Sequence, residues 1–281
     1  MRILLTNDDG IRAPGIIALH DALIGAGKGT AGPLGSVVHT IAPLTVQSAT
    51  GHGLTFHTPL MVKDERVTER MSGTAVDGRP ADCVKLAIAN LWPEKFGAGS
   101  RPDLVVSGMN SGANVGINVI YSGTVAAALE AAFLGIPSIA VSLHMGRGDP
   151  DWALAARHGR RAVEAILAAG PLEPHACLTV NIPVTEIGMA ATETSRYPIR
   201  VCPMNTHGLV DKYEKRTAPL GEVYFWAAGH GLDFKSTDEG SDVQAIFQRC
   251  ITVTPLRYDL TKKSVVQKWR DRIGDAASLE R

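Results

Sequence analysis

The sequence predicts an α/β protein in which helices cover both faces of a sheet. Segments that read as strands alternate with segments that read as helices up to about Pro183 of the 281-residue chain. The strand-like segments are rich in Val and Ile and lack a polar face, as is typical of strands that are buried on both sides. A hydrophobic content of 45% is ample for such a core.

The alternation begins with residues 2–6 (RILLT), a β-type run that ends on the acidic loop 7–10 (NDDG). Pro14 then opens a helix whose isoleucine and leucine side chains recur at the spacing of one helical face. A glycine-rich loop at 25–35 leads to a second strand at 37–42, which a proline ends. These residues predict the first β-α-β succession of the sheet.

The middle of the chain continues the pattern. Residues 81–91 read as a helix because prolines stand just before and soon after them. Residues 104–107 (LVVS) read as a strand that runs into a loop of Gly, Asn and Ser. Small side chains at 124–134 predict a helix that Gly135 closes. A strand at 138–143, a helix at 152–169 and a strand at 177–182 complete the alternation.

The last third of the chain has a different character. Residues 194–231 combine aromatic side chains with prolines and are typical of irregular β-hairpin structure. Asn205, His207 and Asp211 lie in this stretch, but their spacing specifies no chemistry. A late strand at 250–254 precedes a polar tail, which is interpreted as a solvated terminal helix or as a subunit arm.

The charge balance restricts the partners of the protein. Lys plus Arg and Asp plus Glu both number 28, so the formal net charge is zero. Proteins that hold nucleic acid polymers or anionic lipid surfaces usually carry a basic excess, which argues against both partners here. The longest charge-free apolar stretch, 113–129, is too short to span a bilayer, and the first ten residues do not form a signal peptide.

The cysteines indicate the compartment. Cys83, Cys177, Cys202 and Cys250 lie far apart, and no CxxC pair occurs. This spacing fits neither a disulfide framework nor a zinc site. They read as buried small hydrophobic residues of a protein in a reducing compartment, and we expect a cytoplasmic protein.

The first group of residues that could bind a ligand or take part in catalysis is the acidic pair Asp8 and Asp9 after the first strand. Ligands bind beyond the carboxyl ends of strands in open α/β sheets, and adjacent carboxylates there repel each other unless they share a cation. A hard divalent cation with oxygen ligands would satisfy them. The alternative interpretation is a turn, in which Asp9 caps the following helix.

The second constellation is the segment 107–124, where glycines alternate with Asn, Ser and Thr. It follows a strand and enters a helix, and a helix N-terminus offers unpaired N–H groups to an anion. The segment therefore resembles a phosphate cradle beside a metal ligand, although a long loop of ordinary turn residues has the same composition. A third polar loop, 47–53, contains Ser48 and His52 and could complete the site or could be ordinary surface.

Together these segments resemble the SurE family, the stationary-phase survival proteins, which are metal-dependent nucleotidases. The residues that carry the resemblance are ILLTNDDG at 3–10 with Pro14-Gly15, Ala42-Pro43 with Ser48, PADCV at 80–84, PDLVVSGMNSGANVG at 102–116, YSGTV at 121–125 and TVTPL at 252–256. They come in family order and span nearly the whole chain. The NDDG and SGxNxGxNxG…YSGTV motifs are specific.

The resemblance implies a site with three groups of residues. It implies that Asp8, Asp9, Ser48 and Asn110 bind one divalent metal ion per subunit, Mg²⁺ or Mn²⁺. It implies that Asn114, Ser122, Gly123 and Thr124 bind phosphate. It also implies that Asp8, Asp9 and Asn110 are catalytic. The sequence leaves open whether Asp8 or a water activated by the metal begins the attack on the phosphorus.

The resemblance also implies an activity and an architecture. The expected reaction is hydrolysis of nucleoside 5′-monophosphates, and possibly of 3′-monophosphates, to nucleoside and phosphate. The expected architecture is a Rossmann-like three-layer α/β/α sandwich with a protruding β-hairpin and an exchanged C-terminal segment, in a homodimer or homotetramer. The chain would divide into a catalytic core (1–190), an extended hairpin region (191–240), and a returning strand with an assembly tail (241–281).

The sequence departs from the family pattern in three places. Residues 44–47 (LTVQ) replace a run that is commonly charged in the family. Residues 196–226 match the family poorly, which makes substrate range the least transferable property. Arg79 stands where a Thr is usual, and it could reach a phosphate or pair with Asp77. The rival functions are a non-enzymatic metal- or phosphate-binding signalling domain and a metal-dependent exopolyphosphatase or transferase on the same sheet.

Overall fold

A computed structural model describes residues 1–281 except 28, 191–196, 211, 229–231 and 275–281. Its main feature is a nine-stranded sheet with the order β3-β4-β2-β1-β5-β6-β7-β11-β8. Neighbours from β4 to β7 are parallel, whereas β3 and β11 run antiparallel to β4 and β7. The strands are β1 Arg2–Thr6, β2 Val37–Pro43, β3 Val62–Arg66, β4 Ser72–Val76, β5 Leu104–Ser111, β6 Ser138–Leu143, β7 Cys177–Ile182, β8 Ile199–Val201 and β11 Ile251–Leu256.

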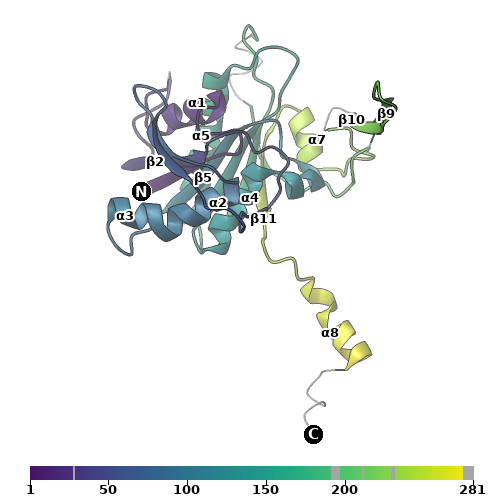
Figure 1. The fold of residues 1–281 in the computed structure, drawn as a ribbon. Coiled ribbons are helices and arrows are strands. Elements are labelled where there is room, and N and C mark those ends of the chain that lie inside the picture. Colours follow the sequence, from purple (N-terminus) through teal and green to yellow (C-terminus); the bar gives the residue numbers. More distant parts are fainter. Residues whose placement is uncertain (28, 191–196, 211, 229–231, 275–281) are drawn as a thin grey trace.

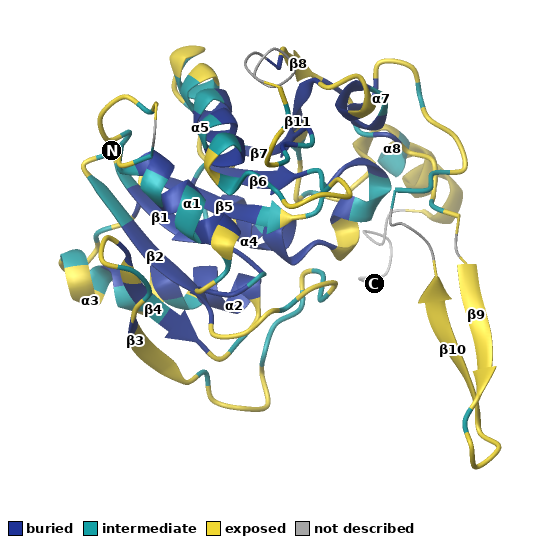
Figure 2. Ribbon diagram, turned by 90° about the horizontal axis from the view of Figure 1, so that it is seen from above, coloured by how far each residue is buried: buried dark blue, intermediate teal, exposed yellow. Residues whose placement is uncertain are grey.

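Helices cover both faces of this sheet (Figures 1 and 2). On one face, α1 (Pro14–Leu23) and α5 (Trp152–Ala168) bury apolar side chains in the larger core cluster. On the other face, α2 (Pro80–Leu86) and α4 (Gly123–Phe133) bury theirs in a second cluster against β1 and β5. The predicted α/β class, with its helix-sheet-helix layers, is therefore confirmed.

The remaining helical elements are short or peripheral. They are a π-helical turn at Ala87–Leu91, α3 Trp92–Phe96, a 3-10 helix at Gly116–Tyr121, α7 Asp242–Phe247 and α8 Lys263–Ile273. The expected helix at 81–91 therefore begins one residue earlier and does not stop before Pro93. Proline is tolerated in the first turn of a helix, and Trp92 is fully buried there, which holds the continuation in place.

Some elements of the structure were not predicted from the sequence. β3 and β4 were not predicted, because β3 (VKDER) is largely exposed and polar and β4 contains glycine. Similarly, α7 was not predicted, since it is only six residues long and therefore too short to show periodicity.

The four cysteines are buried and unpaired, as expected. Within the described residues, no helix is long and apolar enough to cross a membrane.

The C-terminal third leaves the sheet and returns to it. β9 (Lys212–Thr217) and β10 (Val223–Ala228) form an exposed two-stranded antiparallel sheet, which Figure 2 shows apart from the main body. β11 then pairs with β7, and the chain continues into α8, which extends away in Figure 1 and has no buried residue. Asp211 lies outside the described residues. The three-part division of the chain stays a prediction.

Candidate active site

The candidate residues gather at the carboxyl edge of the parallel strands. The register places Thr6 of β1 beside Ser107 of β5, so Asp8, just after β1, and Asn110, near the end of β5, lie at the same edge of the sheet. At the same edge, Ser142 of β6 pairs with Asn181 of β7. Parallel strands bring their carboxyl ends together, which is why two motifs a hundred residues apart form one site.

Asp8 is the most buried acid of the site, at 4% exposure. The Thr124 hydroxyl donates a hydrogen bond to Asp8 Oδ1. Gly123 packs directly behind the carboxylate: a Cβ at this position would lie 2.8 Å from Asp8 Cβ. The N-terminus of α4 and the end of β1 are therefore in direct contact.

The electrostatics of Asp8 reflect this position. Burial raises the pKa of Asp8 to about 6, the hydroxyl of Thr124 opposes the rise, and the neighbouring charge of Asp9 adds to it. A carboxylate that resists ionisation in this way is stabilised by a nearby cation. A bound cation would therefore favour the ionised form of Asp8.

Hydrogen bonds orient the side chains of Asp9 and Asn110. The backbone N–H of Ser111 donates to Asp9 Oδ2 over 2.9 Å. The Nδ2 group of Asn110 donates to the Gly112 carbonyl over 2.8 Å, which fixes the side-chain amide. Within the described residues, no donor bonds to Asn110 Oδ1, so this oxygen remains available as a ligand.

The loop 47–53 closes one side of the site. The N–H of Gln47 donates to the Asp8 carbonyl over 2.7 Å, and the N–H of Gly51 donates to the Tyr121 carbonyl over 3.1 Å. Ser48 lies between these two anchors and is exposed. His52 Nε2 contacts the buried Glu130 carboxylate at 2.8 Å, which holds the far end of the loop against α4.

Among the candidate phosphate-binding residues, Ser122 to Thr124 form the start of α4. Ser122 is the N-cap, and its Oγ accepts from the Val125 N–H over 3.1 Å. Among the described residues its hydroxyl proton has no acceptor, so it can donate to another group. The Thr124 hydroxyl is fully buried on Asp8, so this side chain orients the acid instead of facing solvent.

Asn114 is placed differently from a simple phosphate ligand. Its Nδ2 donates to the buried Ser142 Oγ over 2.8 Å. Its backbone N–H and C=O both bond to the Asn181 side-chain amide, at 2.7 and 3.0 Å. Sequence reasoning missed Ser142 and Asn181, although a polar residue near the end of an otherwise apolar strand was the available signal.

Arg79 does not pair with Asp77 among the described residues. Its guanidinium lies over Gly53, where a Cβ would come within 2.1 Å of Nη1. The residue after it, Pro80, touches Gly123, with Pro80 Cγ 3.0 Å from the position of a Cβ there. The side chain therefore belongs to the rim formed by the loop 47–53 and α2.

The donor set determines which metal the site suits. The described residues contain no group of three or more His, Cys, Asp or Glu side chains that could hold a metal ion. Two carboxylates, an amide oxygen and a hydroxyl form a different kind of set, because only two of the four belong to those residue types. Hard oxygen ligands of this kind suit Mg²⁺ or Mn²⁺ better than zinc.

The fold and this edge define an α/β protein whose acidic strand end meets the N-terminus of a helix, an arrangement suited to a cation and a phosphate side by side. A family model described as "Survival protein SurE" matches residues 3–208. The chain therefore belongs to the SurE family.

Relatives match along nearly the whole chain. The 5′-nucleotidase SurE of Heliobacterium modesticaldum is 40% identical, with 99% of this chain and 94% of the relative covered. That of Rhodopirellula baltica is 41% identical, with 96% and 98% covered. The crystal structure of SurE protein from Aquifex aeolicus has a TM-score of 0.75 at 34% identity and covers 97% of this chain and 99% of its own.

Proposed function

We propose that this protein is a divalent-metal-dependent phosphomonoesterase that hydrolyses nucleoside 5′-monophosphates, and possibly 3′-monophosphates, to nucleoside and phosphate. The observation that carries the proposal is the contact between the acidic end of β1 and the N-terminus of α4, through Asp8, Gly123 and Thr124. Relatives of 37–41% identity that are named 5′-nucleotidase SurE support the same reaction.

The metal site in this proposal consists of Asp8, Asp9, Asn110 and Ser48, with one Mg²⁺ or Mn²⁺ per subunit. When bound, the ion offsets the negative charge of the phosphate monoester, which otherwise repels a nucleophile. Asn110 and Asp9 serve it through the oxygens that their own hydrogen bonds leave available. Ser48 would complete the set from the loop that Gln47 anchors on Asp8.

The chain's own groups bind and orient the phosphoryl group. Ser122 donates its hydroxyl proton, and Gly123 offers a backbone N–H that the helix leaves unpaired in its first turn. Such donors stabilise the phosphoryl oxygens as charge redistributes in the transition state. Thr124 holds Asp8 in place, and Asn114 contributes through the amide hydrogen that does not bond to Ser142.

Three finer properties belong to the same proposal. We propose that the protein acts in the cytoplasm, that it forms a homodimer or homotetramer, and that the C-terminal segment 241–281 takes part in assembly. The exposed apolar side chains of the hairpin and of α8 support the assembly role, because a partner surface would remove them from water.

The test is phosphate release from AMP, GMP and 3′-AMP, with EDTA compared against added Mn²⁺ or Mg²⁺. The expected result is metal-dependent release that is nearly abolished in Asp8→Ala. Asp103→Ala is the matched control, because Asp103 lies at the start of β5, at the opposite end of the strand that carries Asn110. Absence of release with every nucleotide and metal would refute the activity, and full activity of Asp8→Ala would refute the site. Release from short polyphosphate alone would favour an exopolyphosphatase.

A further inference from the structure

The segment 114–116 at the entrance to the phosphate site is held from two sides. On the side of the sheet, Asn181 bonds to the Asn114 backbone, and Ser142 bonds to its side chain. Gly116 begins the 3-10 helix that leads directly to the cap Ser122, so the position of Gly116 affects the start of α4. On its opposite side, this segment contacts α7.

On that opposite side, the carboxylate of Asp242 accepts hydrogen bonds from two distant parts of the chain. Asp242 Oδ2 accepts from the Gly116 N–H over 2.8 Å, and Oδ1 accepts from the Asn205 N–H over 2.8 Å. The side chain is fully buried, at 0% exposure. Both of its oxygens act as acceptors from backbone donors, which a neutral amide cannot reproduce.

Packing reinforces these hydrogen bonds. Gly116 adopts φ +61°, and a Cβ there would lie 2.7 Å from Phe234 Cε1. Val115 is buried in an apolar cluster with Val243 and Ile246 of α7. The segment 114–116 therefore sits between the strand ends and α7, and only glycine fits at its third position.

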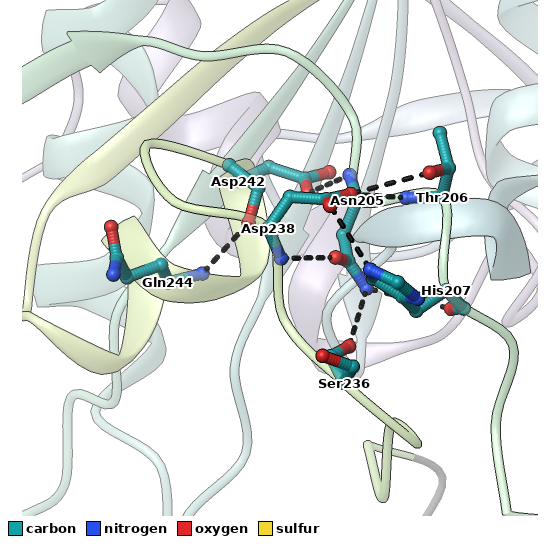
Figure 3. A network of polar contacts seen from close by, with 8 residues as sticks. Asn205, Thr206, His207, Ser236, Asp238, Asp242 and Gln244 are labelled. Carbon is teal, nitrogen blue, oxygen red and sulfur yellow. Dashed lines mark hydrogen bonds and ion pairs between the residues drawn. The ribbon is translucent and has the colours of Figure 1, made fainter.

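The same network, drawn in Figure 3, extends to Asn205, Ser236 and Asp238, which flank the arm that carries the β9–β10 hairpin in the chain. Asn205 Oδ1 accepts from the Asp238 N–H over 2.8 Å, and Asn205 Nδ2 donates to the Ser236 carbonyl over 3.3 Å. At the outer end, the exposed Asp238 carboxylate contacts His207 at 3.0 Å. Residues 205 and 238 lie on either side of the hairpin in the chain, so the network closes its base.

We propose that Asp242 is a positioning residue of the active site: it fixes Gly116, and through it the phosphate-binding start of α4, against the base of the hairpin arm. The inference rests on the proposed function of that site. It extends the site to a part of the chain that contacts no substrate. It also predicts that loss of the hydrogen bond between the Gly116 N–H and Asp242 changes phosphate binding.

The decisive comparison is Asp242→Asn against Asp238→Asn, which makes the same chemical change at the inner and the outer end of one network. In Asp242→Asn, one oxygen becomes a donor that faces a backbone N–H. We expect faster amide hydrogen exchange at Gly116 and a tenfold or greater increase in the Kd for inorganic phosphate in the presence of Mn²⁺. The KM for AMP should rise more than kcat falls. Asp238→Asn should leave all three measurements near those of the unchanged protein.

A second variant protects the test against a folding defect. Phe234→Ala removes the half-buried ring over Gly116 and leaves the sheet untouched, so it should shift the Gly116 exchange and the phosphate Kd in the same direction. Unchanged Gly116 exchange and unchanged phosphate affinity in folded Asp242→Asn would overturn the inference, as would equal effects in Asp238→Asn. The exchange measurement needs no turnover, so a failure of the proposed nucleotidase activity would be recognised separately.

Discussion

At the scale of single residues, the site depends on the absence of a side chain as much as on the acids. Gly123 leaves room for Asp8, since a Cβ there would come within 2.8 Å of Asp8 Cβ and 3.0 Å of Oδ2. The conflict is with the first atoms of a buried side chain, which has no room to rotate away.

Gly123→Ala is therefore expected to displace Asp8 and to lower kcat/KM about a hundredfold, the cost typical of a 1 Å misplacement at a reacting centre. Gly32→Ala is the control, because a Cβ at Gly32 meets nothing within 4 Å. Steady-state kinetics with AMP compare the two. Equal kinetics in both variants would contradict the tight contact.

The proton and the metal compete for Asp8. Because burial raises the pKa of Asp8 to about 6, metal binding must displace a proton below that pH. We expect Mn²⁺ affinity to fall by about tenfold per pH unit below pH 6, since one proton is released for each ion bound. Isothermal titration calorimetry between pH 5 and 8 measures this slope.

Thr124→Val removes the hydroxyl that opposes the rise in the pKa of Asp8. The decline in Mn²⁺ affinity should then begin at a higher pH, whereas Thr124→Ser, which keeps the hydroxyl, should behave like the unchanged protein. Identical pH profiles for Thr124→Val and Thr124→Ser would show that this hydrogen bond does not tune Asp8.

At the scale of elements, different parts of the strands have different functions. The ends of β1 and β5 carry the candidate site, whereas β2 contributes to packing through His39. His39 on β2 is 9% exposed and lies against Trp92 and Phe96, with ring centroids 6.1 and 5.6 Å away. Burial lowers the pKa of His39 to about 4, and Lys95 adds to the effect.

This shift predicts acid destabilisation. The folded-state pKa of His39 lies below its value in the unfolded chain, so the unfolded state takes up a proton first. The stability contribution is complete above about pH 6.5 and is lost as the pH falls towards 4. Between pH 7 and pH 5 the loss is about 2 kcal/mol, at about 1.4 kcal/mol per pKa unit.

Urea unfolding of the unchanged protein and of His39→Gln at pH 7 and pH 5 tests this estimate. The variant should be less stable at pH 7 because it loses ring packing, but its free energy of unfolding should fall less on acidification. Other buried histidines, such as His20, titrate in both proteins, so only the difference between the two is informative. Parallel pH dependences would refute the assignment to His39.

At the scale of the whole molecule, the last helix has no place in the core. None of the residues of α8 is buried, yet Trp269 and Ile273 lie one turn apart and expose 53% and 77% of their surface. An amphipathic helix of this kind is stabilised mainly by packing against another surface. A second copy of the chain is the partner that the proposed assembly supplies.

Ile273→Glu should therefore shift the mass measured by light scattering after gel filtration towards the monomer. Gln267→Glu places the same charge on the polar side of α8, where Gln267 bonds to Asp271, and should leave the mass unchanged. The circular dichroism of both variants should match that of the unchanged protein. An unaltered mass for Ile273→Glu would argue against a role of α8 in assembly.

Local patterns predicted the central strands and the helices on both faces, because each of these elements buries a continuous apolar surface. The same patterns failed for β3, β4 and α7. β3 is polar and lies at the edge of the sheet, and α7 owes its position to Asp242 and to the cluster around Val115. Such elements are stabilised by neighbours that are distant in sequence, so their own residues contain little signal.

The sequence by itself determined the α/β class and the family, and it marked Asp8, Asp9, Asn110 and the start of α4 as the candidate site, since strand periodicity and motif residues are local properties of the chain. Only the tertiary structure decided how these residues are used: that Thr124 orients Asp8, that Asn114 is held by Asn181 and Ser142, and that Asp242 holds Gly116. The physical reason is that a hydrogen bond between residues far apart in the chain depends on sheet register and on the packing of α7. Neither can be read from the residues that make the bond.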